Sequence, residues 1–327
     1  MLCLHARVPC LFAILQVLSR LFPFARGLCH AYWAPNAWAL YSFADKVAAA
    51  AAAGAGLMQR PAAANMAGGI VGISTYAVLP NVGAGTCALL VLLALVPCLV
   101  ALWKARRDQA LTMLAPAVAY ANLCGFMFGY HVHEKAALAV EIPMALAAVR
   151  HAGWGQLYVL FSSAAHVGIF PLLFETQEVP IRWLLAVVYY IICVWGLASV
   201  HLQSRGKVSK AAGVLQEQPH EGMRTRRQSA QQQQGSTPAP AQKAAAASGA
   251  GAPAAPLSMH ECCSWLPLLY RAYLAGLVVL ELYCTLGHKA LLGERLPFVP
   301  LMLTSVYCAV GVTWAWGWMA VWFLQQC

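Results

Sequence analysis

Two short segments between apolar stretches carry side chains that could hold an anion. The first segment, residues 20–36, combines the cations Arg20 and Arg26 with the aromatic rings of Tyr32 and Trp33. Guanidinium groups bind phosphate well, and aromatic rings pack against sugar or lipid. These residue types indicate a ligand-facing loop at a membrane surface, and an interfacial belt of aromatic residues is the alternative.

The second segment reads His-Val-His-Glu-Lys over residues 131–135 and follows an apolar stretch directly. Four ionisable side chains in five positions are costly at a membrane boundary unless they are solvated or used. Imidazole and ammonium groups can stabilise a phosphate leaving group in a partly desolvated pocket. A solvated helix end is the plain alternative. A metal site is weaker, because helical spacing puts His131 and His133 on different faces and no third clear ligand is near.

The composition predicts a polytopic membrane protein, whose helices would position these two segments. Of 327 residues, 61% are hydrophobic and 10% are charged, with a mean hydropathy of +0.64, whereas soluble domains carry about a quarter charged residues. A membrane helix needs about 20 apolar residues. We therefore expect an all-α fold with about seven or eight membrane helices, one of them represented by the short apolar segment 9–18. The longer candidates are residues 82–103, 111–130, 136–149, 154–174, 181–201, 265–286 and 298–324.

The basic residues indicate topology rather than a nucleic-acid surface, despite a formal net charge of +10. Basic clusters at 104–107, at Arg150 and at 205–210 each adjoin a predicted span, so the positive-inside rule places them in the cytosol. Residues 20–80, 131–135 and 175–178 then share the opposite, lumenal side. We expect a lipid bilayer as partner and no nucleic acid.

The chain divides into five parts by composition. Residues 202–258 contain a glutamine run and alanine-glycine runs, with seven basic and two acidic residues, and have too few large apolar residues to fold. We expect a disordered cytosolic linker there. The other parts are an apolar helix remnant (1–19), a lumenal loop with surface helices (20–80), transmembrane helices with the His-Val-His-Glu-Lys segment on their lumenal side (81–201), and a C-terminal pair of transmembrane helices (259–327).

Other chemistry-bearing residues carry weaker signals. The sequence has no Walker loop, nucleotide fingerprint or nucleophile elbow. His166 and Glu141 lie within predicted spans and are expected to be hydrogen-bonded packing residues, whereas the role of Glu281 stays open. The two aspartates are Asp45, expected to pair with its neighbour or start a helix, and Asp108, expected on the cytosolic side.

The two polar segments carry a resemblance to a known family. QVLSRLFPF at 16–24, RGL at 26–28 and FGYHVHEK at 128–135 resemble the endoplasmic-reticulum glucosyltransferases that use dolichyl-phosphate glucose. The continuations HAYWAPN at 30–36 and LTSVYCAVG at 303–311 look like the second enzyme of that set. The similarity extends over about residues 12–47, 80–200 and 260–325.

The resemblance implies a glycosyltransferase of the GT-C class in the endoplasmic-reticulum membrane, multi-pass, with its active side lumenal. The implied reaction moves glucose from dolichyl-phosphate glucose to the monoglucosylated oligosaccharide on dolichyl diphosphate, by an α-1,3 linkage with inversion. No cofactor and no metal are expected. Within this resemblance, His133 and Lys135 are expected closest to the phosphate. The expected phosphate-binding residues are Arg20, Arg26, His131, His133 and Lys135; the expected substrate-binding residues are His30, Tyr32, Trp33, Asn36 and Glu134.

The chain departs from the family in one respect. Such enzymes carry a general-base aspartate in their first lumenal loop, and neither Asp45 nor Asp108 matches that motif. We therefore assign no catalytic residue here and expect this chain to be a C-terminal portion of a longer enzyme. The alternatives are the first glucosyltransferase of the same pathway, a multi-span transporter, and a non-catalytic assembly partner that binds the donor.

Overall fold

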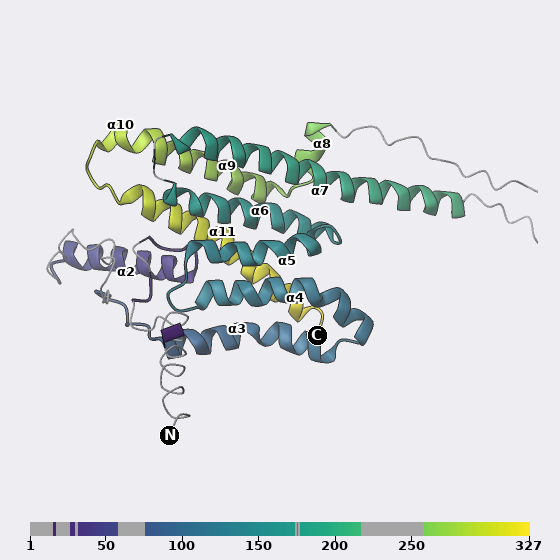
Figure 1. Cartoon of the computed structure of the whole chain (residues 1–327), viewed down its shortest axis with the longest axis horizontal. Helices are drawn as coiled ribbons and strands as arrows, with labels where there is room; N and C mark the ends of the chain where they lie inside the picture. The colour runs from purple at the N-terminus through teal and green to yellow at the C-terminus, as the bar shows by residue number, and fades with distance from the viewer. Residues whose placement is uncertain are drawn as a thin grey trace, which may run out of the picture.

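The computed structural model describes residues 16–17, 27–29, 32–57, 76–173, 175, 177–216 and 258–327, with only the backbone given for 205–216, 259 and 263. The elements in these ranges are all helical, as expected from the composition (Figure 1). They are α2 (Ala37–Gly54), α3 (Ala84–Lys104), α4 (Arg107–Phe128), η2 (Glu134–Ala137), α5 (Leu138–Ala148), α6 (Ala152–Ile169), η3 (Phe170–Leu172), α7 (Glu178–Gln216), α8 (Met259–Ser264), α9 (Leu268–Leu282), the π-helical η4 (Tyr283–Gly287), α10 (His288–Leu292) and α11 (Val299–Leu324).

The helices form a row that one long helix crosses. Helices α3, α4, α5 and α6 follow one another as antiparallel neighbours, and α6 packs on α7 and α9 (Figure 1). Helix α11 runs diagonally across this row and contacts α2, α3, α4, α6 and α9. Short turns join the antiparallel neighbours, so alternate helix ends gather at the two ends of the bundle.

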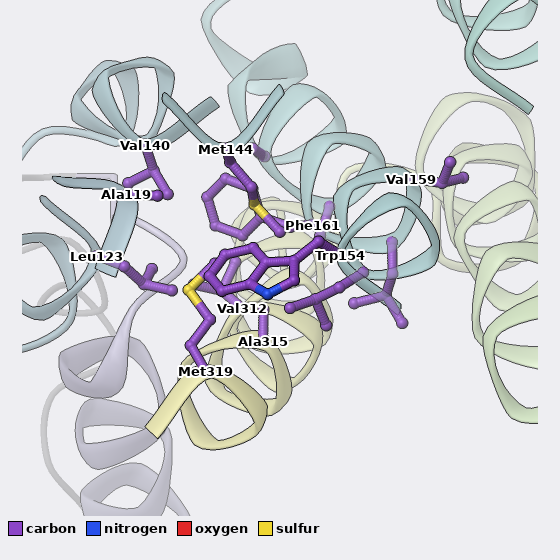
Figure 2. Close-up of a cluster of buried hydrophobic side chains, with 14 of the residues drawn as sticks. Ala119, Leu123, Val140, Met144, Trp154, Val159, Phe161, Val312, Ala315 and Met319 are labelled. Carbon is purple, nitrogen blue, oxygen red and sulfur yellow. The ribbon is translucent and has the colours of Figure 1, made fainter. Parts of the chain in front are cut away.

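The core lies where α4, α5, α6 and α11 meet. Trp154 of α6 is 1% exposed and packs among Leu123 of α4, Met144 of α5 and Met319 of α11 (Figure 2). Fully buried alanines such as Ala119 belong to the same cluster. Small residues let helices approach closely, which matters in a membrane because lipid tails are as apolar as the side chains they compete with.

Five helical segments of the described chain are long and apolar enough to span a membrane: Ala84–Lys104, Arg107–Phe128, Glu178–Ser204, Leu268–Leu292 and Val299–Leu324. Two of the seven longer candidate spans are not among them. Residues 136–149 form part of η2 and the eleven-residue α5, which is about 17 Å long against a hydrocarbon core of about 30 Å. Residues 154–174 give α6, whose polar residues lower its hydropathy and whose eleven buried positions face other helices.

The helix that precedes the expected linker is longer than predicted. Helix α7 continues to Gln216, past the predicted boundary at residue 202. Residues 202–216 include alanine, lysine, glutamine and leucine, which favour helices, and the first proline of this region comes at Pro219. Residues 217–257 lie outside the described residues, as does most of the predicted 1–19 remnant.

The two ends of the bundle differ in charge. One end, which we call the basic end, holds the turns 105–106 and 149–151 together with Lys104, Arg107 and Arg150. The opposite end holds α2, residues 129–137, η3 and α10 (Figure 1). The His-Val-His-Glu-Lys segment therefore lies at the end away from the basic turns.

Candidate functional site

The His-Val-His-Glu-Lys segment, residues 131–135, begins in a tight turn after α4. His131 has a φ of 54°, in the left-handed region that few non-glycine residues adopt. Its backbone N–H donates to the Leu28 carbonyl at 3.0 Å, and its Nδ1 lies 2.8 Å from the Gly27 carbonyl oxygen. Both contacts compensate the cost of this backbone conformation. They also fix residues 27–29 beside the segment.

The segment alternates between side chains that face the protein and side chains that face outward. Glu134 is 4% exposed, whereas its neighbours His133 and Lys135 are both exposed. The rings of His131 and His133 lie edge to face with centroids 5.7 Å apart. The argument that helical spacing separates these two rings is therefore wrong, because residues 131–133 precede η2 and are not helical.

Glu134 is the buried residue of the segment, and its charge acts on Tyr32. Burial is the main cause that raises the pKa of Tyr32 well above its usual value, and the negative charge of Glu134 adds to this rise. The Tyr32 hydroxyl donates to the Gly168 carbonyl of α6 at 2.8 Å. The Tyr32 phenol thus stays un-ionised at neutral pH and joins the loop to α6.

The loop of residues 32–36 is held by helices from distant parts of the chain. Ser305 of α11 donates its hydroxyl to the Trp33 carbonyl at 2.8 Å, and Trp33 itself is 8% exposed. Gly168 of α6 approaches the loop so closely that an added Cβ would lie 2.8 Å from Cγ of Pro35. The loop is therefore packed between α6 and α11 instead of standing free at the surface.

Asn36 joins the start of α2 to the end of α4. Its side-chain oxygen accepts from the Trp38 N–H at 3.0 Å, which caps α2, and its Nδ2 donates to the Phe126 carbonyl at 2.9 Å. The Trp38 indole donates to the Gly129 carbonyl at 2.8 Å. Both polar ends of Asn36 are thus engaged within the protein, and the substrate contacts predicted for Tyr32, Trp33 and Asn36 stay predictions.

The structure brings seven of the ten predicted site residues to one end of the bundle. These are Tyr32, Trp33, Asn36, His131, His133, Glu134 and Lys135. Arg20, Arg26 and His30 lie outside the described residues. Within the described ranges no three His, Cys, Asp or Glu side chains gather as metal ligands would. A metal-free site stays a prediction.

Asp45 of α2 holds the chain that leads into α3. Its carboxylate accepts from the backbone N–H groups of Ala77, Val78 and Leu79 at 3.1, 2.9 and 2.9 Å. Burial by itself raises the pKa of Asp45, but these three donors lower the pKa more, so the net pKa is below the usual value. Asp45 is therefore a structural anchor for residues 77–79.

We expect Asp45→Asn to loosen residues 77–79 at neutral pH and to remove an acid transition of the parent protein. Because the folded pKa lies below the unfolded value of about 4, the stabilisation is complete above that value and is lost as the pH falls through the folded pKa. Hydrogen exchange of the 77–79 amides between pH 3 and pH 7 measures both effects. Equal protection in Asp45→Asn and the parent at neutral pH would contradict this anchor role.

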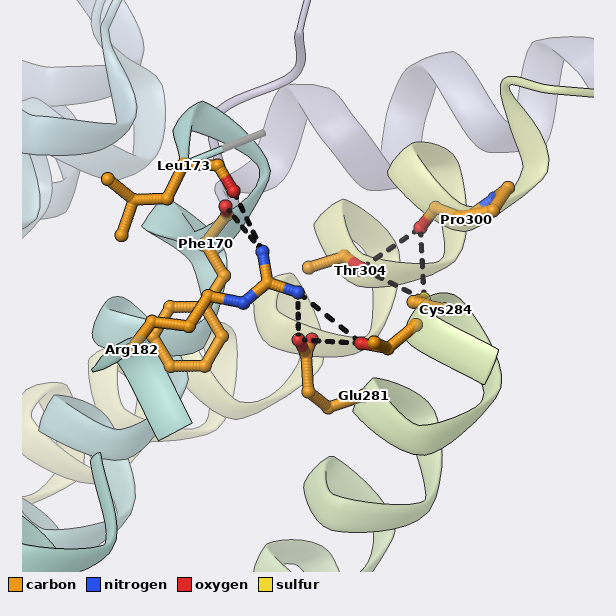
Figure 3. Close-up of polar contacts among 8 residues, drawn as sticks. Phe170, Leu173, Arg182, Glu281, Cys284, Pro300 and Thr304 are labelled. Carbon is orange, nitrogen blue, oxygen red and sulfur yellow. Dashed lines mark hydrogen bonds and ion pairs between the residues drawn. The ribbon is translucent and has the colours of Figure 1, made fainter. Parts of the chain in front are cut away.

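Two pairs of acidic and basic side chains lie within the described part of the helical bundle, and sequence reasoning did not identify the pairing. Nε2 of His166 lies 3.2 Å from Oε2 of Glu141, which agrees with their expected packing role. Glu281, whose role was open, pairs with Arg182 at 2.6 Å (Figure 3). Arg182 was not singled out at all. The sequence pattern that could have identified it is an arginine just inside one apolar span together with an acidic residue inside another span.

Residues 2–319 match the ALG6, ALG8 glycosyltransferase family. The chain belongs to this family. Within the ALG6, ALG8 family, it is 35% identical to a protein of Arabidopsis thaliana over 93% of this chain and 51% of that relative. It is 34% identical to a relative in Gibberella zeae, over 94% of this chain and 50% of the relative, and 32% identical to one in Mus musculus, over 92% and 46%.

All three relatives bear the name dolichyl pyrophosphate Glc1Man9GlcNAc2 alpha-1,3-glucosyltransferase. This chain spans about half the length of these ALG6, ALG8 family relatives. No solved structure matches the chain. The family resemblance read from residues 16–36, 128–135 and 303–311 is confirmed.

Proposed function

We propose that this chain provides the donor-phosphate side of an α-1,3-glucosyltransferase. The proposed reaction transfers glucose from dolichyl-phosphate glucose to the monoglucosylated, dolichyl-diphosphate-linked oligosaccharide, with inversion, on the lumenal face of the endoplasmic-reticulum membrane. The names of the relatives support the acceptor and the linkage. The observation that carries the proposal is the exposure of His133 and Lys135 at the end of the bundle away from the basic turns.

The geometry fits departure of a phosphate monoester. As the acceptor hydroxyl oxygen bonds to the anomeric carbon of glucose, the bond from that carbon to the phosphate oxygen breaks and negative charge grows on the phosphate. The Lys135 ammonium and the His133 ring face outward where such a group would lie, and fixed donors at a developing charge lower the barrier. Buried Glu134 and the contacts of His131 hold the segment in one conformation.

Loss of the acceptor proton requires a general base, and we assign none among the described residues. Asp45 is engaged by three backbone donors, and Asp108 lies in the first turn of α4 at the basic end. The proposal therefore gives this chain the roles of donor binding and leaving-group stabilisation.

The transporter alternative loses its support from buried charges. Glu141 and Glu281 each lie opposite a basic side chain, His166 and Arg182, at ion-pair distance. Such partners account for ionisable residues inside a membrane without a transported solute. The first glucosyltransferase of the pathway is the remaining alternative within the family.

The test is to express the chain in cells that accumulate the monoglucosylated precursor and to identify the lipid-linked glycans by mass spectrometry. We expect conversion to the diglucosylated precursor if the chain is active alone. In parallel, binding of a short-prenyl phosphate glucose to the purified chain tests the donor role directly. The absence of both conversion and donor binding would refute the proposal. Conversion of the unglucosylated precursor alone would identify the chain with the first enzyme of the pathway.

A further inference from the structure

A groove with almost wholly apolar walls lies between α6, α7 and α9, and no residue of the His-Val-His-Glu-Lys segment lines it. Its volume is about 480 Å³, within the usual range for ligand pockets. Val167 of α6, Val187 of α7 and Leu274 of α9 are among its lining residues. Its three helices contain or border predicted membrane spans, so its natural occupant is apolar along most of its length.

Three charged or readily charged side chains line the groove, and two of them are matched within the protein. Glu281 forms an ion pair with Arg182, and His166 lies 3.2 Å from Glu141. The third, Arg271, is exposed, and no described residue forms an ion pair or side-chain hydrogen bond with it. The groove therefore carries one cation for which the described chain offers no anion.

Arg271 lies toward the basic end of the bundle. It belongs to the first turn of α9, and its N–H bonds to the Pro267 carbonyl. The Trp265 carbonyl just before accepts from Gln156 at 2.6 Å, in the second turn of α6. Long helical side chains lean toward the N-terminus of their helix, so the guanidinium extends from the groove toward the headgroups on that side.

We propose that this groove holds one anionic glycerophospholipid from the leaflet at the basic end, with its phosphate on Arg271 and an acyl chain along α9 toward Glu281. From Arg271 to Glu281, α9 rises about 15 Å, which accommodates most of one chain. Guanidinium binds phosphate through two hydrogen bonds. An anionic headgroup fits better than a zwitterionic one, because it keeps a net negative charge that Arg271 can neutralise.

A polyprenyl phosphate is the main competing occupant. Its phosphate in the proposed reaction belongs beside Lys135, at the opposite end from the free cation of the groove. The position of Arg271 therefore favours a phospholipid whose headgroup lies on the basic side.

The test uses the whole chain in nanodiscs that contain phosphatidylcholine and phosphatidylserine, followed by transfer to mild detergent and native mass spectrometry. We expect one retained phosphatidylserine per chain. Arg271→Gln should reduce its occupancy about fivefold or more, the effect of one cation near an anionic membrane surface. Arg271→Lys should retain part of it, and Ala275→Phe, which fills the groove while keeping Arg271, should remove it.

Arg150→Gln is the matched control, because Arg150 is an exposed cation at the same end and does not line the groove. This variant should retain the lipid as the parent does. Circular dichroism and thermal unfolding in the same detergent verify that each variant is folded. Undiminished phosphatidylserine in Arg271→Gln, equal retention of phosphatidylcholine, or a bound polyprenyl phosphate would each overturn the proposal.

Discussion

Replacement of Arg182 by alanine is expected to destabilise the protein by about 3–5 kcal/mol, the usual cost of leaving a buried charge without its partner. The side chains of Arg182 and Glu281 are 11% and 9% exposed, and Nη2 of Arg182 lies 2.6 Å from the carboxylate. Solvent can replace little of this interaction. The unfolding free energy in mixed detergent micelles, from titration with a denaturing detergent, measures the loss.

Arg182 also satisfies the end of α6. Its Nη1 donates to the carbonyls of Phe170 and Leu173 at 3.2 and 2.9 Å, and its guanidinium lies 5.4 Å from the centre of the Phe170 ring (Figure 3). Carbonyls at a helix C-terminus have no partner within the helix, and a cation there is favourable. One side chain thus joins α6 and η3 to α7 and α9.

A double replacement distinguishes the ion pair from general damage to the fold. Arg182→Met with Glu281→Leu removes both charges, so it should be closer in stability to the parent than Arg182→Ala is. Arg295→Ala, an exposed cation at the same end, is the control and should change stability by no more than about 0.5 kcal/mol. A loss that small in Arg182→Ala would contradict the proposed importance of the pair.

Replacement of Lys135 by alanine should weaken donor binding without reducing stability. A hydrogen bond to a charged group contributes about 1.5–3 kcal/mol, so we expect affinity for a short-prenyl phosphate glucose to fall roughly 10- to 100-fold. The stability should be unchanged because the Lys135 side chain is exposed. Equilibrium binding of the radiolabelled donor to the purified chain gives the affinity.

Lys289→Ala is the matched control for this measurement. Lys289 is an exposed lysine of α10 at the same end of the bundle, and it is not part of the His-Val-His-Glu-Lys segment. If Lys135 belongs to a donor site, Lys289→Ala should bind the donor with the same affinity as the parent. Equal losses in the two variants would mean that the donor responds to the overall charge of this end and not to a site.

The sequence was sufficient for the helical class and for the side of the bundle on which residues 131–135 lie. The hydropathy of a segment and the basic residues beside it are local properties, so they can be read from the sequence without knowing which other helices that segment contacts. Five of the seven longer candidate spans match helices that are long and apolar enough to cross a membrane, whereas α5 is short and polar residues lower the hydropathy of α6.

The partners of individual side chains could not be read from the sequence. Arg182 and Glu281 are 99 residues apart, and Ser305 and Trp33 are 272 apart. Periodicity along one helix says which face is apolar, but not which residue of another helix meets it. Residues 32–36 show the same limit: Trp33 is buried against α2 and α11, and Asn36 bonds to α4.

The contact between Ser305 and the Trp33 carbonyl has a consequence for biogenesis. A ribosome synthesises residues 32–36 before α11, so every helix between them must be inserted before α11 can hold the loop. Until then the Trp33 carbonyl lacks its donor Ser305, and the Trp33 ring lacks its apolar contacts with α11. Insertion of α11 is therefore also the step that completes the packing around residues 32–36.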